Sequence, residues 1–192
     1  NFYRQSGGED EVFWSESELL RQFNHHVIQY TDSNADLDAA SSNVKLVSKT
    51  LWNSVHYRRL RAVIRQEKPE IVHVHNTLPL LSPSIYYAAH AEGIPVVQTA
   101  HNYRPFCLNG VLYRNGHICT DCVGRTPFSG VAHKCYRNSL SASAVVFALY
   151  ALHYQLLRTY SSTISIFIAS ANFTKNLLIT MGLPEDKIIV KP

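Results

Sequence analysis

Apolar residues follow two patterns along the chain, one with helical spacing and one of short unbroken runs. Apolar positions that recur every three or four residues predict helices at 9–23, 51–64, 82–92 and 139–160, and a further helix at 172–182. Short runs rich in β-branched residues predict strands at 27–30, 71–75, 96–100, 164–169 and 188–190. Residues 31–43 are polar and predict a loop. Asn172 is the expected N-cap of the last helix.

Strands that alternate with helices of ten or more residues indicate βαβ units. The expected fold class is α/β, a Rossmann-like parallel sheet with helices on both faces. With 192 residues and a hydrophobic content of 46%, the chain is expected to form a single domain over 1–192. The first helix of such a fold normally follows a strand. Residues 1–3 are therefore the expected end of a first strand that is largely missing.

The positive charge of the chain is concentrated in one segment. The net charge of +4 is too small to predict a general nucleic-acid surface. Between residues 101 and 138, a single acidic residue, Asp121, stands against five basic ones, namely Arg104, Arg114, Arg125, Lys134 and Arg137. This segment, predicted to be a long inserted loop, is expected to attract anionic groups such as phosphates.

The sequence carries no pattern typical of a secretory signal, which predicts a cytoplasmic protein. Because the chain begins at Asn1 without an initiator Met, a targeting segment before Asn1 is still compatible with the sequence. Residues 142–152 are almost entirely apolar but too few to span a bilayer. They predict either a core helix or a face that contacts the inner side of a membrane or a partner domain.

A glycine pair precedes the first predicted helix. Gly7 and Gly8 would let the backbone approach a phosphate, and the helix N-terminus would offer unpaired N–H groups and a positive dipole. The alternative is a tight turn that only caps the helix. The dinucleotide-binding fingerprint G-x-G-x-x-G is not present at this position.

Three histidines lie in or directly after predicted strands. His101 follows the strand at 96–100, and ligands of open α/β sheets bind outside the carboxyl ends of the strands. An imidazole there could bond a sugar hydroxyl or stabilise charge on a transferring phosphate. His73 is expected to be a core histidine, whereas His75, at the end of its strand, is as compatible with a substrate contact as with a core position.

All four cysteines fall in the basic segment, with the spacing Cys107-x11-Cys119-x2-Cys122-x12-Cys135. Four thiolates around a central C-x-x-C suit a closed, tetrahedral, structural Zn²⁺ site, which leaves no open position for metal catalysis. Free thiols, disulfides and an iron–sulfur cluster are the alternatives. His117 and His133 are further possible ligands.

Four segments resemble those of one enzyme family. They are NFYRQSGGEDEVF, IVHVHNTLPLLSPSIYYAA, VVQTAHNYRPFCLNG and FIASANFTKNLLITMGLPEDKIIVKP. Together they resemble the N-terminal domain of family 4 (group 1) retaining glycosyltransferases. The resemblance implies a GT-B fold, in which two Rossmann-like domains enclose the active site. The N-terminal domain mainly receives the acceptor, and the C-terminal domain binds the nucleotide sugar.

The resemblance also implies roles for individual residues. Gly7 and Gly8 match the glycine loop that approaches the donor diphosphate, and His101 matches the active-site histidine near the donor sugar. His75, Asn102 and Arg104 are further candidate contacts of the acceptor or substrate.

The implied reaction is transfer of a sugar, with retained configuration, from a nucleotide-sugar donor to a saccharide or lipid-linked saccharide acceptor, in polysaccharide or glycolipid biosynthesis. The resemblance implies no metal for the chemistry. The donor-binding domain, with its E-x7-E motif, is not found in these 192 residues, so this fragment alone is expected to be inactive.

Two other functions are compatible with parts of the sequence. The four-cysteine segment with its arginines could belong to a zinc-bearing module that binds nucleic acid or protein. An NAD-dependent oxidoreductase would have the same fold, but the missing G-x-G-x-x-G argues against it.

Overall fold

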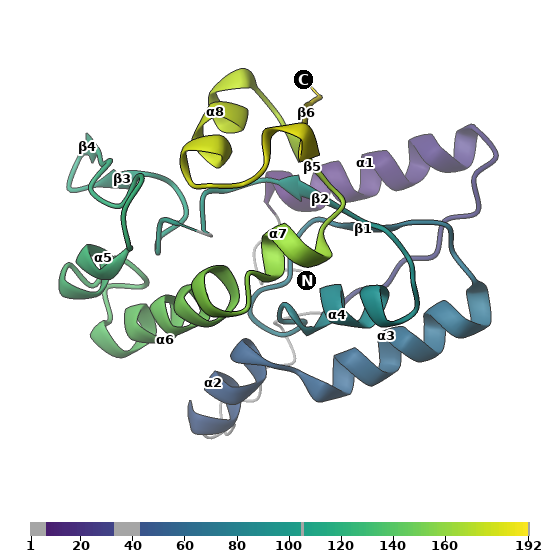
Figure 1. The fold of residues 1–192 in the computed structure, drawn as a ribbon, viewed down its shortest axis with the longest axis horizontal. Coiled ribbons are helices and arrows are strands. Elements are labelled where there is room, and N and C mark those ends of the chain that lie inside the picture. The colour runs from purple at the N-terminus through teal and green to yellow at the C-terminus, as the bar shows by residue number, and fades with distance from the viewer. Residues whose placement is uncertain (1–6, 33–42, 105, 192) are drawn as a thin grey trace. The chain divides into compact units, whose positions relative to one another are not determined.

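The computed structural model describes residues 7–32, 43–104 and 106–191, which form two compact units, one up to Ile94 and one from Pro95 (Figure 1). The expected strand end at residues 1–3 lies outside the described residues, as does most of the predicted loop at 31–43. A single domain over 1–192 stays a prediction. Among the helices of the described residues, none combines the length and the apolar character needed to span a bilayer.

The first unit contains four helices and one strand among its described residues. In chain order they are α1 (Gly8–Gln22), α2 (Asn43–Leu51), α3 (Ser54–Glu67), β1 (Val72–Val74) and α4 (Ser84–Ala91). Helices α3 and α4 pack along one another (Figure 1). Beyond the end of α4, the Glu92 carboxylate accepts hydrogen bonds from Arg61 Nε at 2.5 Å and from Arg65 Nε at 2.9 Å. These bonds join the two helices at the surface.

A buried asparagine divides the helix that the sequence predicts at 51–64. The Asn53 side chain accepts hydrogen bonds from the backbone N–H groups of Val55 and His56, which makes Asn53 the N-cap of α3. Its Nδ2 donates to the Leu80 carbonyl at 2.6 Å, and its backbone N–H donates to Ser82 Oγ at 2.9 Å. The prediction of one continuous helix is wrong, because these bonds hold Asn53 in an extended conformation between α2 and α3.

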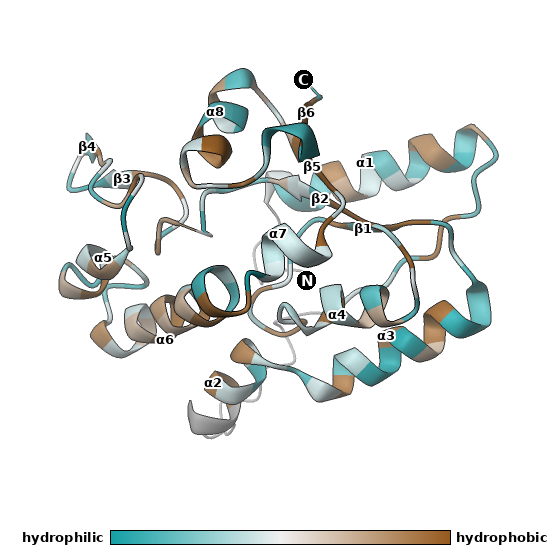
Figure 2. Cartoon of the chain, viewed as in Figure 1, coloured by the Kyte–Doolittle hydropathy of each residue, from teal (hydrophilic) through white to brown (hydrophobic). Residues whose placement is uncertain are grey.

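Helix α1 confirms the helix predicted at 9–23, but its apolar residues are not all buried. Hydrophilic and hydrophobic residues alternate along α1 (Figure 2). Leu19, Leu20 and Phe23 are exposed, the last by 71%, whereas Asp10 and Ser17 are buried. The face of α1 that lies inward therefore carries polar side chains, and these belong to the candidate site.

The second unit is built on a parallel sheet of β2 (Val96–Ala100), β5 (Ile166–Ala169) and β6 (Ile188–Val190). Helix α8 (Asn172–Thr180) and the short η3 turn (Glu185–Lys187) connect β5 to β6, and α8 packs against both strands. The last residues of β2 and β5, Ala100 and Ala169, are partners in the ladder. The parallel α/β arrangement expected from the sequence is confirmed.

The helix predicted at 139–160 is three elements, namely α6 (Leu140–Tyr150), the π-helix η2 (Ala151–Leu156) and α7 (Thr159–Thr163). The prediction of one helix is wrong because Arg158 adopts a left-handed conformation, with φ of 49°. His153, fully buried in η2, bonds Thr159 Oγ1 through Nδ1 at 2.9 Å across this break. One side of α6 is buried, whereas its first residue, Leu140, is 55% exposed.

Two further sequence predictions about local structure are wrong. Residues 27–30 do not form a strand, since Tyr30 is held by a side-chain hydrogen bond to His56 instead. Asn172 is the first residue of α8, and the N-cap position belongs to Ala171.

The segment at 101–138 contains a hairpin of β3 (Tyr113–Arg114) and β4 (His117–Ile118), followed by α5 (Phe128–Ala132). Asn115 and Gly116 form the turn, both with positive φ, at 52° and 84°. This conformation is the two-residue hairpin turn for which Asn-Gly is the favoured pair.

Candidate functional site

In the first unit, the candidate site begins at the N-terminus of α1. Gly7 is the N-cap of α1, and its N–H donates to the Asp10 carboxylate at 3.1 Å. Gly7 and Gly8 are exposed, and a Cβ built on either would meet nothing within 4 Å. Packing among the described residues does not require glycine here. The pair leaves the start of the helix open to a ligand, although Asp10 already accepts from the Gly7 N–H.

The end of β1 is bonded to the first turn of α1. Asn76 Nδ2 donates to Glu9 Oε1 at 2.6 Å, and Asn76 Oδ1 accepts from the Leu78 N–H at 2.9 Å. Gly8 is next to Glu9 in the chain, and His75 is next to Asn76. The structure therefore brings the glycine pair and His75, which are 67 residues apart, to the same side of the first unit.

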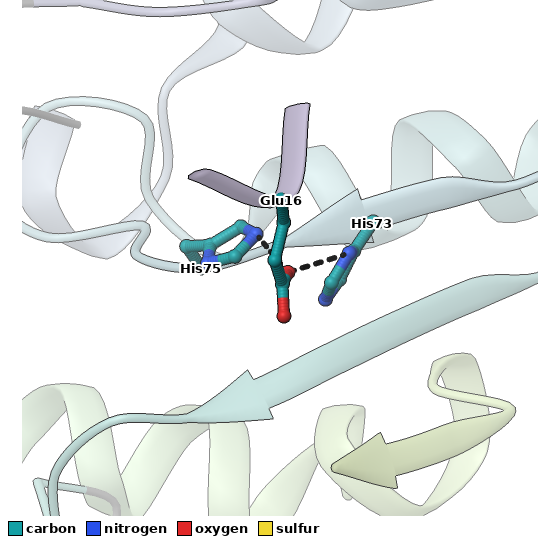
Figure 3. A group of neighbouring side chains, drawn as sticks. All are labelled: Glu16, His73 and His75. Atoms are coloured by element: carbon teal, nitrogen blue, oxygen red, sulfur yellow. Dashed lines mark ion pairs between the residues drawn. The ribbon is translucent and has the colours of Figure 1, made fainter. Parts of the chain in front are cut away.

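A carboxylate from α1 lies between two histidines of the β1 segment (Figure 3). Glu16 Oε2 is 3.4 Å from His75 Nε2 and 3.7 Å from His73 Nδ1. The ligand atoms of these three residues lie within 4.8 Å of one another, so the group could share a proton or hold a divalent cation. The expectation that His73 is a core residue is wrong, because its side chain is 26% exposed and paired with Glu16.

These side chains border a cavity of the first unit. Glu9, His73, His75 and Asn76 line an open cavity with about 570 Å³ of empty space, part of it continuous with solvent. Apolar residues also line it, among them Leu60, Leu81 and Ile85. A cavity lined by a few polar groups and several apolar side chains suits a small polar ligand with an apolar face, such as a sugar ring.

A series of hydrogen-bonded polar side chains also reaches this cavity, at Tyr30. Tyr30 Oη is 2.8 Å from His56 Nδ1, and His56 Nε2 is 2.7 Å from the Asp32 carboxylate. Burial lowers the pKa of His56, and burial also raises the pKa of Tyr30, so both groups are neutral at neutral pH. The imidazole then donates a hydrogen bond to Asp32 and accepts one from the Tyr30 hydroxyl, which fixes Tyr30 at the cavity wall.

In the second unit, His101 directly follows β2, at the carboxyl end of the parallel sheet, as the sequence predicts. Asn102 Oδ1 accepts a hydrogen bond from the Arg104 N–H at 3.0 Å and shapes the turn after His101. The turn is closed by Tyr103, whose carbonyl accepts from the Cys107 N–H at 2.7 Å. His101, Asn102 and Arg104 thus share one short segment at a strand end.

Arg104 has a buried guanidinium with incomplete hydrogen bonding. Its Nε and Nη1 are shielded from solvent and have no hydrogen-bond partner among the described residues. The guanidinium lies over the ring of Tyr136, 5.2 Å from its centroid. Burial raises the pKa of the nearby Tyr160 to about 12, so this phenol stays neutral and supplies no counter-charge. A guanidinium with two buried nitrogens that lack hydrogen-bond partners among the described residues favours an anionic ligand.

The four cysteines lie together in the second unit. Cys107, Cys119, Cys122 and Cys135 line one small cavity, and none of them forms a disulfide. Burial raises the pKa of Cys122 to about 11 and also raises that of Cys135. Cys122 and Cys135 therefore stay protonated near neutral pH, which argues against a role of these two thiols as catalytic nucleophiles.

A comparison with protein-family profiles matches almost the whole chain to one family. The family profile described as Glycosyltransferase Family 4 matches residues 7–192. The chain belongs to glycosyltransferase family 4. No curated protein gave a match to this family 4 chain.

Solved structures show a weaker similarity to the family 4 chain. A UDP-GlcNAc 2-epimerase from Neisseria meningitidis, bound to UDP-GlcNAc, is 17% identical, with a TM-score of 0.41 over 90% of this chain and 33% of that one. A UDP-N-acetylglucosamine 2-epimerase from Rickettsia bellii is 13% identical, with a TM-score of 0.41 over 98% and 36%. The chain spans about a third of the length of these proteins. Similarity at this level does not indicate which substrate the family 4 chain uses.

The sequence patterns do not predict the two site carboxylates of this family 4 chain, Glu9 and Glu16. They are seven residues apart on α1 and therefore on the same face, together with Phe13, whose ring meets His75 edge-on at 5.5 Å. Carboxylates on the same helical face as a half-buried aromatic residue are the signal that would have identified them.

Proposed function

We propose that this family 4 chain is the acceptor-side domain of a retaining, hexosyltransferase-like glycosyltransferase. The enzyme transfers a sugar from a nucleotide-sugar donor to a saccharide or lipid-linked saccharide, in polysaccharide or glycolipid synthesis. The observation that carries the proposal is the match of the family profile to residues 7–192. The polar residues at the ends of β1 and β2 support it, because ligands of such sheets bind at the carboxyl ends of the strands.

In the proposed reaction, the bond between the anomeric carbon and the diphosphate breaks while the acceptor oxygen bonds that carbon on the same face. The acceptor hydroxyl passes its proton to an oxygen of the leaving diphosphate, which departs with the bonding electron pair. The open N-terminus of α1 at Gly7 and Gly8 offers backbone N–H groups to the diphosphate. His101 stabilises the reacting sugar by hydrogen bonding near the anomeric carbon.

A panel of radiolabelled nucleotide sugars tests the proposal, with sugar–nucleotide cleavage and transfer to lipid-linked saccharides measured on the full-length protein. We expect cleavage of at least one donor, with the product retaining its anomeric configuration by NMR. An inverted product would contradict retention. Binding of nicotinamide nucleotides, with no cleavage of any donor, would contradict the transferase assignment.

Arg104 is proposed to receive an anionic group of the substrate, such as a phosphate. Arg104→Met removes the charge while retaining most of the volume, and we expect kcat/KM for sugar transfer to fall about ten- to a hundredfold. The free energy of unfolding should not fall, because the variant no longer buries two guanidinium nitrogens that lack hydrogen-bond partners in the described part of the chain. Kinetics and urea unfolding are measured side by side.

Arg125→Met is the matched control, since Arg125 is an exposed arginine of the same segment. It should change neither quantity. Loss of stability in Arg104→Met with unchanged transfer would instead assign Arg104 a structural role, through its contact with Tyr136.

His75 is proposed to bond an acceptor hydroxyl, with Glu16 as the residue that orients its ring. Glu16→Gln keeps the size of the side chain but removes the charge between the two histidines. We expect the acceptor KM to rise up to about tenfold, while the donor KM stays the same. Steady-state kinetics with each substrate varied in turn measure the two values.

Glu18→Gln, on the exposed side of α1, is the control for this variant. A change in the donor KM, or a loss of kcat alone, would contradict an acceptor-side role for the Glu16–His75 pair.

A further inference from the structure

The four cysteines come from four different parts of the segment after β2, yet they face one cavity. Cys107 ends the turn after Arg104, Cys119 follows β4, Cys122 lies in the next turn and Cys135 follows α5. Nine other residues also line the cavity, among them Leu112, Asp121 and His133. Since all four cysteines of the chain line one small cavity, we expect them to share a chemical role.

Backbone hydrogen bonds hold three of these cysteines in place. The Cys119 N–H donates to the Leu112 carbonyl at 2.8 Å, and the Cys135 N–H donates to the Gly130 carbonyl at 2.9 Å. The Cys107 N–H donates to Tyr103 at 2.7 Å. These bonds fix the backbone at three of the four cysteines around the cavity before any ligand binds.

The secondary structure around the cavity is too small to be stable alone. Strands β3 and β4 have two residues each, and α5 has five. Several apolar side chains of this segment point to solvent, and Ile118 is 83% exposed. An isolated short hairpin and a single helical turn are marginal in water, so a cross-link is expected to hold the segment together. Disulfides do not supply it, since all four cysteines are free.

The charge around the cavity fits a thiolate-bound cation. Arg114, on β3, bonds the Asp121 carboxylate at 2.6 Å and also interacts with Cys119. Four thiolates around a divalent cation carry a net charge of −2. Because the Asp121 carboxylate offsets the charge of Arg114, the guanidinium supports a thiolate ligand through its interaction with Cys119 and not by net positive charge.

We propose that Cys107, Cys119, Cys122 and Cys135 bind one Zn²⁺ ion in a closed tetrahedral site that stabilises the segment at 101–138. Zinc is the single ion that a tetrahedral set of four thiolates favours, and a fully occupied shell leaves it a structural role. Among the described residues, the cysteine sulfurs do not form a group within 4.8 Å, so binding includes rotation of thiols toward the centre of the cavity.

The site would also position part of the proposed active site. Cys107 is three residues from Arg104, and a Cβ built on Gly110 would lie 3.4 Å from Arg104 Nη2. The turn between Tyr103 and Gly110 is thus shared by the metal site and the guanidinium. This consequence rests on the proposed function, whereas metal binding itself does not.

The test is the metal content of the full-length protein purified from cells without added zinc, measured by elemental analysis and native mass spectrometry. We expect about one zinc per chain, with four cysteines that resist alkylation until the metal is removed. A strong chelator should release it and lower Tm by at least about 5 °C. In Cys119→Ser and Cys122→Ser the zinc content should fall to near zero.

His117→Ala is the matched control, since His117 is exposed on β4 and does not line the cavity. It should keep its zinc, and His133→Ala should keep it too if the shell is all sulfur. Iron with acid-labile sulfide, disulfides in the native protein, or metal-free protein with the same Tm before and after chelation would each overturn the proposal. Metal content and Tm of the unmutated protein test zinc binding even if the serine variants do not fold.

Discussion

Replacing His101 by alanine should abolish most of the sugar transfer while leaving the fold intact. His101 directly follows β2, at the carboxyl end of the parallel sheet. Loss of a group that stabilises the reacting sugar is expected to lower kcat about a hundredfold to ten-thousandfold. Transfer is measured with the donor identified from the panel, and the fold is checked by circular dichroism and Tm.

His90→Ala serves as the control, because His90 is an exposed histidine near the end of α4. It should transfer sugar at the normal rate. If His101→Ala also turned over normally, the proposed role of His101 would be lost, although membership of family 4 would stand on the sequence match.

Asn53→Ala should be the most destabilising single substitution in the first unit. The variant loses the N-cap of α3 and leaves the buried Leu80 carbonyl without its donor. The free energy of unfolding is expected to fall by about 2–4 kcal/mol. Urea unfolding, followed by circular dichroism, gives this value.

Ser54→Ala provides the comparison, since the neighbouring Ser54 is exposed at the start of the same helix. Its unfolding midpoint should change little. An Asn53→Ala midpoint equal to that of the unmutated protein would show that solvent or rearranged side chains replace the Asn53 bonds at no cost.

The sequence predicts those elements whose signal is local. The strand at 96–100 has the bounds expected from its run of β-branched residues, as does the strand at 188–190. Both are short runs that follow a predicted helix. Their parallel pairing follows from the alternation of strands and helices.

The breaks in the predicted helices depend on distant or weak signals. Asn53 interrupts an otherwise helical pattern because its partners, Leu80 and Ser82, are 27 and 29 residues away. Arg158, between η2 and α7, has a left-handed conformation that glycine usually adopts, so the sequence gives no local sign of this break. A method that reads only spacing cannot find either feature.

Some residues of the candidate site have a local sequence signal, and others do not. His101 was visible because it follows a strand, and the cysteines were visible from their spacing. Glu16 was not, since its importance lies in its contact with His73 and His75, 57 and 59 residues further along the chain. The Asn-Gly pair at 115–116 was a local signal for the β3–β4 hairpin that went unused.

That same turn has a chemical consequence over time. Asn115 is exposed and is followed by Gly116, which has no side chain to shield its nitrogen from the Asn115 amide carbon. Cyclisation to a succinimide and hydrolysis would convert the amide to aspartate or isoaspartate, next to Arg114. Stored protein would then slowly acquire a negative charge beside the cysteine cavity, so freshly prepared and aged samples should be expected to differ in this segment before any other.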